Sequence, residues 1–489
     1  MKTEKKQQKE WEVQALVDDV KADFERRKAE RKAFELQWQL NMDFANGKQN
    51  NTVSSFGTVV PAGKQFWWQQ REVFNHISPM IESRLARLAD AHPEICVIPA
   101  DSDNRSRECA DVCKKVIAST FQKVGMTELS TAAQMWSEMT GTAFYKIAWD
   151  NTGGAQIGEV NKKPIFQGDI SVTVCSPFEI YPDNTTASSL NEVQSLIHAK
   201  VYKTSTVKEI WGVDVNGGDV EVFDFNNKGK TELGNAVVVI ERYEKPTKEM
   251  PLGRFVSVAG DKLLYNGSLP FCNAAGGART FPFVRQTSES VPGCFWGRSV
   301  IERAIPVQRA YNSVKNRKTE FINRLACGCI SVEDGSVDLE SLENEGLAPG
   351  TVLVYRQGFN APKFFEGGSL PAELEREEER LLREFATITG GSDIARAAEV
   401  SNISGIALQI LTDQDNRRMN RAVSEIMNAY ATIATQILRL YRQFAVERRL
   451  EQLVKGQEFE VFTWDAGVIT SDQICVERKD ETARVWYGK

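Results

Sequence analysis

The chain has 489 residues, of which 42% are hydrophobic and 26% charged, and its formal net charge is −6. This balance is typical of a folded protein of about two to four domains and excludes an intrinsically disordered chain. It also argues against a protein that wraps nucleic acid tightly, because neutralising phosphates requires a clear basic excess. The first forty residues are too highly charged for a signal peptide, and no run of eighteen apolar residues occurs, so we expect a cytoplasmic product.

The first 300 residues combine helical periodicity with alternating, strand-like segments. We predict helices at residues 1–45, 73–88, 106–124 and 129–139, with a further short helix near residue 206. We predict strands at residues 95–99, 141–150, 170–174, 236–243, 254–258 and 262–265, the last two as a hairpin. The expected fold class is therefore α+β, built on an antiparallel sheet.

Helical periodicity returns after Trp296 and dominates most of the remaining chain. A helix with a kink at Pro306 precedes a small acidic insert, in which we expect strands at residues 330–332 and 351–355 around a short helix. A second helix ends at Gly390-Gly391. A third, predicted over residues 404–450, would be about 70 Å long, so it needs neighbours from the rest of the chain or from other copies. Short strands follow at residues 459–462 and 474–477.

The first of these late helices has a basic face, and the second is rich in glutamate. Two interpretations stay open. The basic face can pair with the acidic segment 373–384, which the insert would fold back antiparallel beside it. Alternatively, some basic residues line a surface visited by DNA phosphate. We favour the first for most of them.

No catalytic motif is complete. Gly229-Lys230-Thr231 lacks the preceding glycine of a phosphate-binding loop, since Asp occupies position 224. The paired cysteines have no accompanying ligands of a zinc site, and an odd total of nine favours reduced, buried thiols. None of the three histidines adjoins a serine or cysteine in a nucleophile motif. We therefore predict no enzymatic activity, no cofactor and no metal.

Several strings, in their order, resemble the portal proteins of tailed double-stranded DNA bacteriophages. The most telling are Gly297-Arg298-Ser299 at the start of a helix and Ser404-Gly405-Ile406-Ala407-Leu408-Gln409 at the start of the long one. Earlier strings also match: Asn75-His76-Ile77-Ser78-Pro79, Lys146-Ile147, Trp149-Asp150 and Glu241-Arg242-Tyr243. An α/β insert between two helices completes the pattern.

The resemblance implies a subunit with a wing, a two-helix stem, a clip and a long helix. The implied ranges are wing 1–296, stem helices 297–327 and 369–389, clip 328–368, tunnel loop 390–403, long helix 404–450 and a C-terminal wing or crown segment 451–489. The last is short, which departs from relatives with an extended crown. Portals form a ring of about twelve copies at one capsid vertex, through which DNA is packaged and ejected.

The resemblance also implies site residues and partners. Tunnel-loop candidates for DNA contact are Ser392, Asp393 and Arg396, although Arg396 could equally pair with Glu399. Basic candidates on the stem are Lys315, Lys318 and Arg324. Acidic clip candidates for docking are Glu333, Asp334, Asp338, Glu340, Glu343 and Glu345. Implied partners are the terminase large subunit, a head-tail adaptor, capsid and scaffolding proteins, and passing DNA, with no membrane. The location would be the virion, after assembly in the host cytoplasm.

Two alternatives to a portal remain at this point. Another virion structural protein, such as a head-tail connector or tail ring, would usually be shorter and lack the order of helix, insert, helix, loop and long helix. A DNA-dependent nuclease or ATPase would need the motifs found incomplete above.

Overall fold

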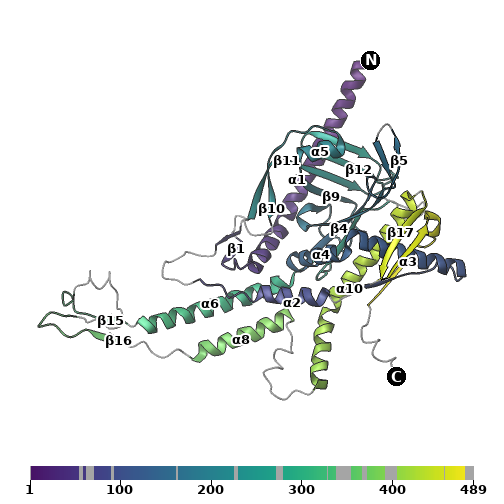
Figure 1. Cartoon of the computed structure of the whole chain (residues 1–489). Helices are drawn as coiled ribbons and strands as arrows, with labels where there is room; N and C mark the ends of the chain where they lie inside the picture. Colours follow the sequence, from purple (N-terminus) through teal and green to yellow (C-terminus); the bar gives the residue numbers. More distant parts are fainter. Residues whose placement is uncertain are drawn as a thin grey trace.

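The computed structural model describes residues 2–53, 59–61, 71–89, 93–160, 163–224, 229–270, 279–327, 329–337, 354–365, 372–390, 405–445, 447–455 and 458–478. A mixed body of helices and sheets carries a long projection (Figure 1). We call this projection the helical arm; it consists of α6 (Val300–Cys327) and α8 (Ala372–Thr389). The short strands β15 (Cys329–Ser331) and β16 (Lys363–Phe365) pair at its far end.

The N-terminal helix α1 (Lys2–Ala45) begins beyond the body and then crosses it (Figure 1). Its apolar stripe, which includes Val17, Val20 and Phe24, packs on a sheet of the body. Two buried arginines fix it there: Arg27 donates to the Tyr181 carbonyl at 3.1 Å, and Arg31 to the Ile180 carbonyl at 2.9 Å. These charges are buried at low cost because carbonyl oxygens accept their N–H groups.

Two antiparallel sheets form the centre of the body. The larger has the order β13-β12-β11-β9-β8, with β10 also paired to β11, and the smaller has the order β14-β4-β7. The strands of the larger sheet are β8 (Ile180–Pro182), β9 (Ser195–Lys203), β10 (Gly218–Asp224), β11 (Gly229–Glu244), β12 (Arg254–Ala259) and β13 (Lys262–Gly267). Those of the smaller sheet are β4 (Thr142–Asp150), β7 (Asp169–Cys175) and β14 (Phe283–Thr287). The predicted α+β class, and the hairpin formed by β12 and β13, are confirmed.

Helices and small hairpins surround these sheets. The helices are α2 (Ile77–Ala89), α3 (Asn104–Val124), α4 (Met126–Thr140), α5 (Thr204–Trp211) and the 3-10 turns η1 (Pro177–Glu179) and η2 (Ala466–Val468). The remaining paired strands are β1 (Asn51–Val53) with β2 (Val59–Pro61), β5 (Gln156–Val160) with β6 (Lys163–Phe166), and β3 (Pro93–Val97) with β19 (Ile474–Arg478). The last pair joins a late segment of the chain to an early one. Among the described helices, none combines the length and apolar character needed to cross a lipid bilayer.

The long helix α10 (Gly405–Phe444) has 40 residues and is therefore about 60 Å long. From Met419 to Tyr441 its apolar side chains are part of the largest core of the body, packed against α3 and the smaller sheet. Its first turns extend away from the body (Figure 1). Among the described residues, the part of this helix that the body encloses is therefore its C-terminal half.

The predicted helix 404–450 is too long at its C-terminal end. The helix ends at Phe444, and β17 (Arg449–Lys455) pairs along its length with β18 (Glu458–Trp464). Arg449 accounts for the change: its buried guanidinium donates to the carbonyl of Gly168 at 2.9 Å and lies over the rings of Trp149 and Tyr441. Tertiary contacts of this kind override helix propensity.

Candidate functional site

The helical arm is held together by ion pairs between its two helices. The ammonium of Lys315 lies 2.6 Å from Glu378 Oε1, and that of Lys318 lies 3.2 Å from Glu378 Oε2 and 3.6 Å from Glu375. Later positions on α6 thus meet earlier positions on α8, so the helices are antiparallel. Pairing within the chain, the interpretation favoured for most of the basic face, accounts for both lysines.

Glu378 is the centre of this arrangement. Its side chain is only 14% exposed, and the Tyr311 hydroxyl also lies 3.4 Å from it. Burial alone would raise the pKa of Glu378, but hydrogen bonds from Lys315 and Lys318 lower it below the ordinary value. The carboxylate therefore stays charged at neutral pH. Arg324 lies on the same helix, and its side chain is outside the described residues.

The root of the arm is attached to the body by a regular ladder of amide side chains. Gln308, Asn312 and Asn316 stand four residues apart on α6 and accept hydrogen bonds from three backbone N–H groups at 3.1–3.2 Å. These donors are the alternate residues Glu72, Phe74 and His76. The distance between successive acceptors on α6 matches the distance between successive donors on the extended segment. Four helical residues rise about 6 Å, and two extended residues span about 6.6 Å. The extended segment thus runs along the helix as a strand runs along a sheet edge.

The string Gly297-Arg298-Ser299 forms the junction between body and arm. The Ser299 hydroxyl accepts from the N–H of Ile301 at 3.1 Å and donates to the carbonyl of Glu138 at 2.5 Å, so it caps α6 and ties it to α4. The backbone of Gly297 lies directly against that of Gly141. Gly297 and Ser299 therefore shape the joint between body and arm.

The far end of the arm contains two of the acidic residues predicted for docking. Glu333 and Asp334 are both exposed. The Glu333 carboxylate accepts hydrogen bonds from the side chain and backbone of Asn360, and these lower its pKa. The other four, Asp338, Glu340, Glu343 and Glu345, lie outside the described residues.

At this end β15 pairs with a segment that the sequence did not predict as a strand, while residues 351–353 of the predicted strand lie outside the described residues. Strand β15 pairs with β16 at residues 363–365, whereas the sequence predicted a strand at 351–355, whose described residues Val354 and Tyr355 belong to no strand. The strand at 351–355 was predicted from its apolar residues alone. Apolar content does not specify which segments pair in a sheet.

The predicted tunnel-loop residues Ser392, Asp393 and Arg396 lie outside the described residues. The structure describes the segment before them. Helix α8 ends at Thr389, and Gly390 adopts φ +71°, the left-handed conformation typical of a helix C-terminus. Their contact with DNA stays a prediction from the sequence.

A cluster of polar side chains that the sequence analysis missed lies between the two sheets. His198 Nδ1 lies 2.8 Å from Glu241 Oε2, which is also 2.6 Å from the Lys146 ammonium. His198 Nε2 lies 3.3 Å from Glu179 Oε2 and 3.8 Å from Cys175 Sγ. The register of β9 against β11 places His198 opposite Glu241, and the other sheet and η1 contribute Lys146, Cys175 and Glu179. That register cannot be obtained from the spacing of one histidine and one cysteine in the sequence.

Charge within this cluster is balanced by its hydrogen bonds. Burial alone would lower the pKa of His198, but hydrogen bonds with Cys175, Glu179 and Glu241 raise it to about 10. Burial alone would raise the pKa of Glu241, but the charge of Lys146 and the hydrogen bond of His198 lower it. The protonated ring of His198 therefore lies between the side chains of Glu179 and Glu241.

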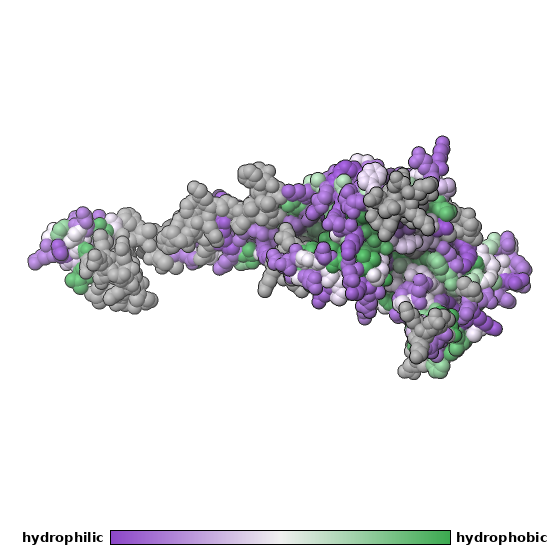
Figure 2. Space-filling model, turned by 90° about the horizontal axis from the view of Figure 1, so that it is seen from above, coloured by the Kyte–Doolittle hydropathy of each residue, from purple (hydrophilic) through white to green (hydrophobic). Residues whose placement is uncertain are grey.

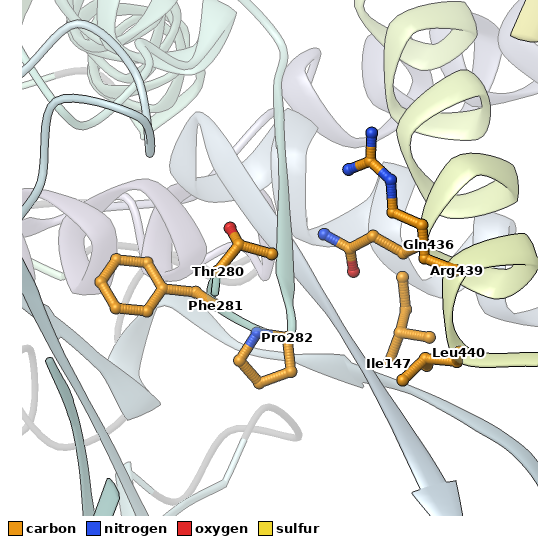
Figure 3. A pocket seen from close by; sticks show the side chains of 7 residues that line it. All are labelled: Ile147, Thr280, Phe281, Pro282, Gln436, Arg439 and Leu440. Atoms are coloured by element: carbon orange, nitrogen blue, oxygen red, sulfur yellow. The ribbon is translucent and has the colours of Figure 1, made fainter. Parts of the chain in front are cut away.

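A small pocket lies where α10 crosses β4 and the segment before β14 (Figure 3). It is lined by Ile147, Thr280, Phe281, Pro282, Gln436, Arg439 and Leu440. Its interior has room for about one water molecule. Two polar groups at its edge are engaged elsewhere: Arg439 pairs with Asp472 at 2.8 Å, and Gln436 donates to the Phe283 carbonyl at 3.5 Å. It is therefore a packing gap and not a substrate site.

Comparison with known proteins gives one family match. Residues 254–464 match the family model described as Phage P22-like portal protein. The matched segment begins at the first residue of β12, ends at the last residue of β18, and contains the helical arm and α10. None of the curated proteins searched matches the chain.

Proposed function

We propose that the chain is a phage portal protein, because residues 254–464 match the P22-like portal family, and that it forms a ring at one capsid vertex. DNA would pass through the centre of the ring during packaging and ejection. The family match is the observation that carries this proposal. The role is structural, and the energy for packaging would come from a separate terminase.

The apolar surface of the arm supports assembly with further copies. Ile322 on α6 and Leu382 and Ile388 on α8 are 46%, 36% and 38% exposed, although they belong to the apolar pattern of their helices. Seen from above, the arm is a narrow projection whose described surface is mainly hydrophilic, with hydrophobic residues near its far end (Figure 2). Neighbouring arms in a ring would cover such side chains, and their burial would favour assembly.

The hairpin of β17 and β18 offers a second apolar surface. Leu450, Val454, Phe459 and Val461 are 68%, 54%, 73% and 48% exposed. Val454 and Phe459 are direct cross-strand partners, so together they form a continuous patch. We assign this patch to contacts between subunits in the body of the ring.

Within this proposal, α6 and α8 are the stem, and the tip with β15 and β16 is the clip. Residues 390–403 are the tunnel loop, and α10 connects that loop to the wing. The exposed carboxylates Glu333 and Asp334 support docking of terminase and a head-tail adaptor through basic surfaces. The net charge of −6 supports a channel that releases DNA, because few phosphate counterions would be displaced.

Docking can be tested apart from assembly. Charge reversal with Glu333→Lys and Asp334→Lys should leave the oligomer unchanged and weaken terminase binding, measured by surface plasmon resonance. Glu379→Lys, on an exposed face of α8, is the matched control. Equal terminase binding by both variants would rule out the clip as the acidic docking site.

A further inference from the structure

We propose that Cys175, Glu179 and His198 form a Zn²⁺ site between the two sheets of the body. Their ligand atoms, the sulfur of Cys175, a carboxylate oxygen of Glu179 and a ring nitrogen of His198, all lie within 4.8 Å of one another. A thiolate, an imidazole and a carboxylate are ligands that zinc accepts together.

The distances fit a tetrahedral ion. With Zn–S near 2.3 Å and Zn–N and Zn–O near 2.0 Å, the S···N edge is about 3.6 Å and the N···O edge about 3.3 Å. The corresponding distances here are 3.8 Å from Cys175 Sγ to His198 Nε2 and 3.3 Å from His198 Nε2 to Glu179 Oε2. Both distances are close to these values, and the remaining edge, from Cys175 Sγ to a Glu179 oxygen, is within 4.8 Å, so a small side-chain movement would bring the three ligands around an ion.

The surroundings of His198 support a metal-binding role for its Nε2 atom. Glu241 lies 2.8 Å from the other ring nitrogen, Nδ1, and a carboxylate in this position orients a histidine ligand. The ring is also packed against Phe283, with centroids 5.6 Å apart. Glu241 is itself held by Lys146 at 2.6 Å and by the Tyr243 hydroxyl at 3.0 Å. Glu241 is thus a positioning residue and not a ligand.

The charges of the ligands and the exposure of Glu179 to solvent both favour binding of a zinc ion. One thiolate and one carboxylate balance the two charges of the ion, while Lys146 and Glu241 balance each other. Cys175 and His198 are each only 2% exposed, whereas the Glu179 side chain is 28% exposed and gives the ion a route from solvent. The other oxygen of Glu179 lies 3.5 Å from the Ser176 hydroxyl, which restricts its rotation.

The site would join the two sheets. Cys175 ends β7 of the smaller sheet, His198 lies in β9 of the larger one, and Glu179 is on η1 between them. An ion bound to all three would stabilise the body through its preferential binding to the folded state. This inference does not depend on ring formation.

The test measures zinc in the purified full-length chain. We expect about one zinc per chain after gel filtration, falling at least about tenfold in Cys175→Ser and His198→Gln. Cys113→Ser removes an equally buried thiol, 1% exposed, on α3 and should keep the zinc. Glu241→Gln should weaken zinc binding by about 10- to 100-fold without abolishing it.

Wild-type protein provides a second measurement should the variants fail to fold. Replacing zinc with Co²⁺ should produce a thiolate-to-cobalt charge-transfer band, and removing the metal with a chelator should lower the apparent melting temperature by about 2–4 °C or more. A wild-type chain that binds neither ion would overturn the proposal. So would zinc content that is unchanged in Cys175→Ser. Either result would leave a hydrogen-bonded ion network as the account of the cluster.

Discussion

The backbones of Gly141 and Gly297 touch where α4 ends and the helical arm begins. A β-carbon on Gly141 would stand 2.5 Å from the carbonyl carbon of Gly297, closer than two such atoms can approach. Gly141 also has φ +91°, and its N–H donates to the Ser137 carbonyl at 2.8 Å, closing α4. Steric contact and backbone conformation therefore both require glycine at this position.

Gly141→Ala should lower the free energy of unfolding by more than about 3 kcal/mol, because the added carbon must displace the backbone of Gly297 and Arg298. Gly212→Ala is the control: it has φ +69° but nothing within 4 Å of the added carbon. It should cost only about 1–2 kcal/mol, the strain of the left-handed conformation. Urea denaturation measures both variants, and equal losses of stability would disprove the role assigned to the contact.

The amide ladder at the root of the arm gives a second prediction. Asn312 is 7% exposed, accepts from the N–H of Phe74 and donates to Gln49 at 2.7 Å. Asn312→Ala should therefore destabilise this joint by about 1–3 kcal/mol, since buried partners lose their hydrogen bonds. Asn316→Ala, at the more exposed rung of the ladder, should cost less. Hydrogen exchange of residues 71–76 checks the difference, and identical protection in both variants would contradict it.

The pairing of α6 with α8 should depend on pH. The pKa of Glu378 is lowered in the folded chain. The stability that its charge adds to the folded state is therefore fully present above the ordinary pKa of glutamate. That contribution is lost as the pH falls through the lower, folded-state pKa. Glu378→Gln should therefore lower the opening free energy of the arm by about 1 kcal/mol at pH 7, with a smaller difference from wild type below about pH 4.

Hydrogen exchange over residues 372–389, corrected for intrinsic rates, measures this effect. Glu379→Gln is the matched control on the same helix, because Glu379 and its partner Arg383 are 68% and 71% exposed. We expect almost no change in that variant. A difference between Glu378→Gln and wild type that stays constant with pH would show that the carboxylate charge is not responsible.

The exposed leucine and isoleucine of α8 should act in assembly. Leu382→Ser and Ile388→Ser should each weaken subunit association by at least about tenfold, because each removes apolar area that a neighbour would bury. Leu381→Ser affects a side chain that is 5% exposed within the chain and should loosen the arm itself. Mass photometry across a dilution series separates the effects. Unchanged association in both exposed-site variants would remove this face from the interface.

Arg396 provides a prediction that is based on the sequence alone. It is the only basic residue between the Gly-Gly break and the long helix. Arg396→Ala should leave ring formation intact and change DNA packaging or retention, with Arg376→Ala on α8 as the control. Wild-type amounts of packaged DNA in the Arg396 variant would cancel its assignment.

Helices were predictable wherever a long apolar stripe recurs every three or four residues, as in α1, α3 and α10. The pairing of α6 with α8 also followed from complementary charge, and Lys315 with Glu378 confirms it. The end of α10 was not predictable, since Arg449 is held by carbonyls and rings from distant segments. The cluster around His198 was missed for a related reason: its members come from five elements, four strands and the turn η1, which only the folded arrangement brings together.

Ring formation is the claim on which the functional account depends, and native mass spectrometry combined with end-on negative-stain averages tests it most directly. The account predicts a closed ring of about twelve copies with an open centre wide enough for duplex DNA. Monomers or small dimers that persist at high concentration, and in the presence of capsid scaffold, would contradict it.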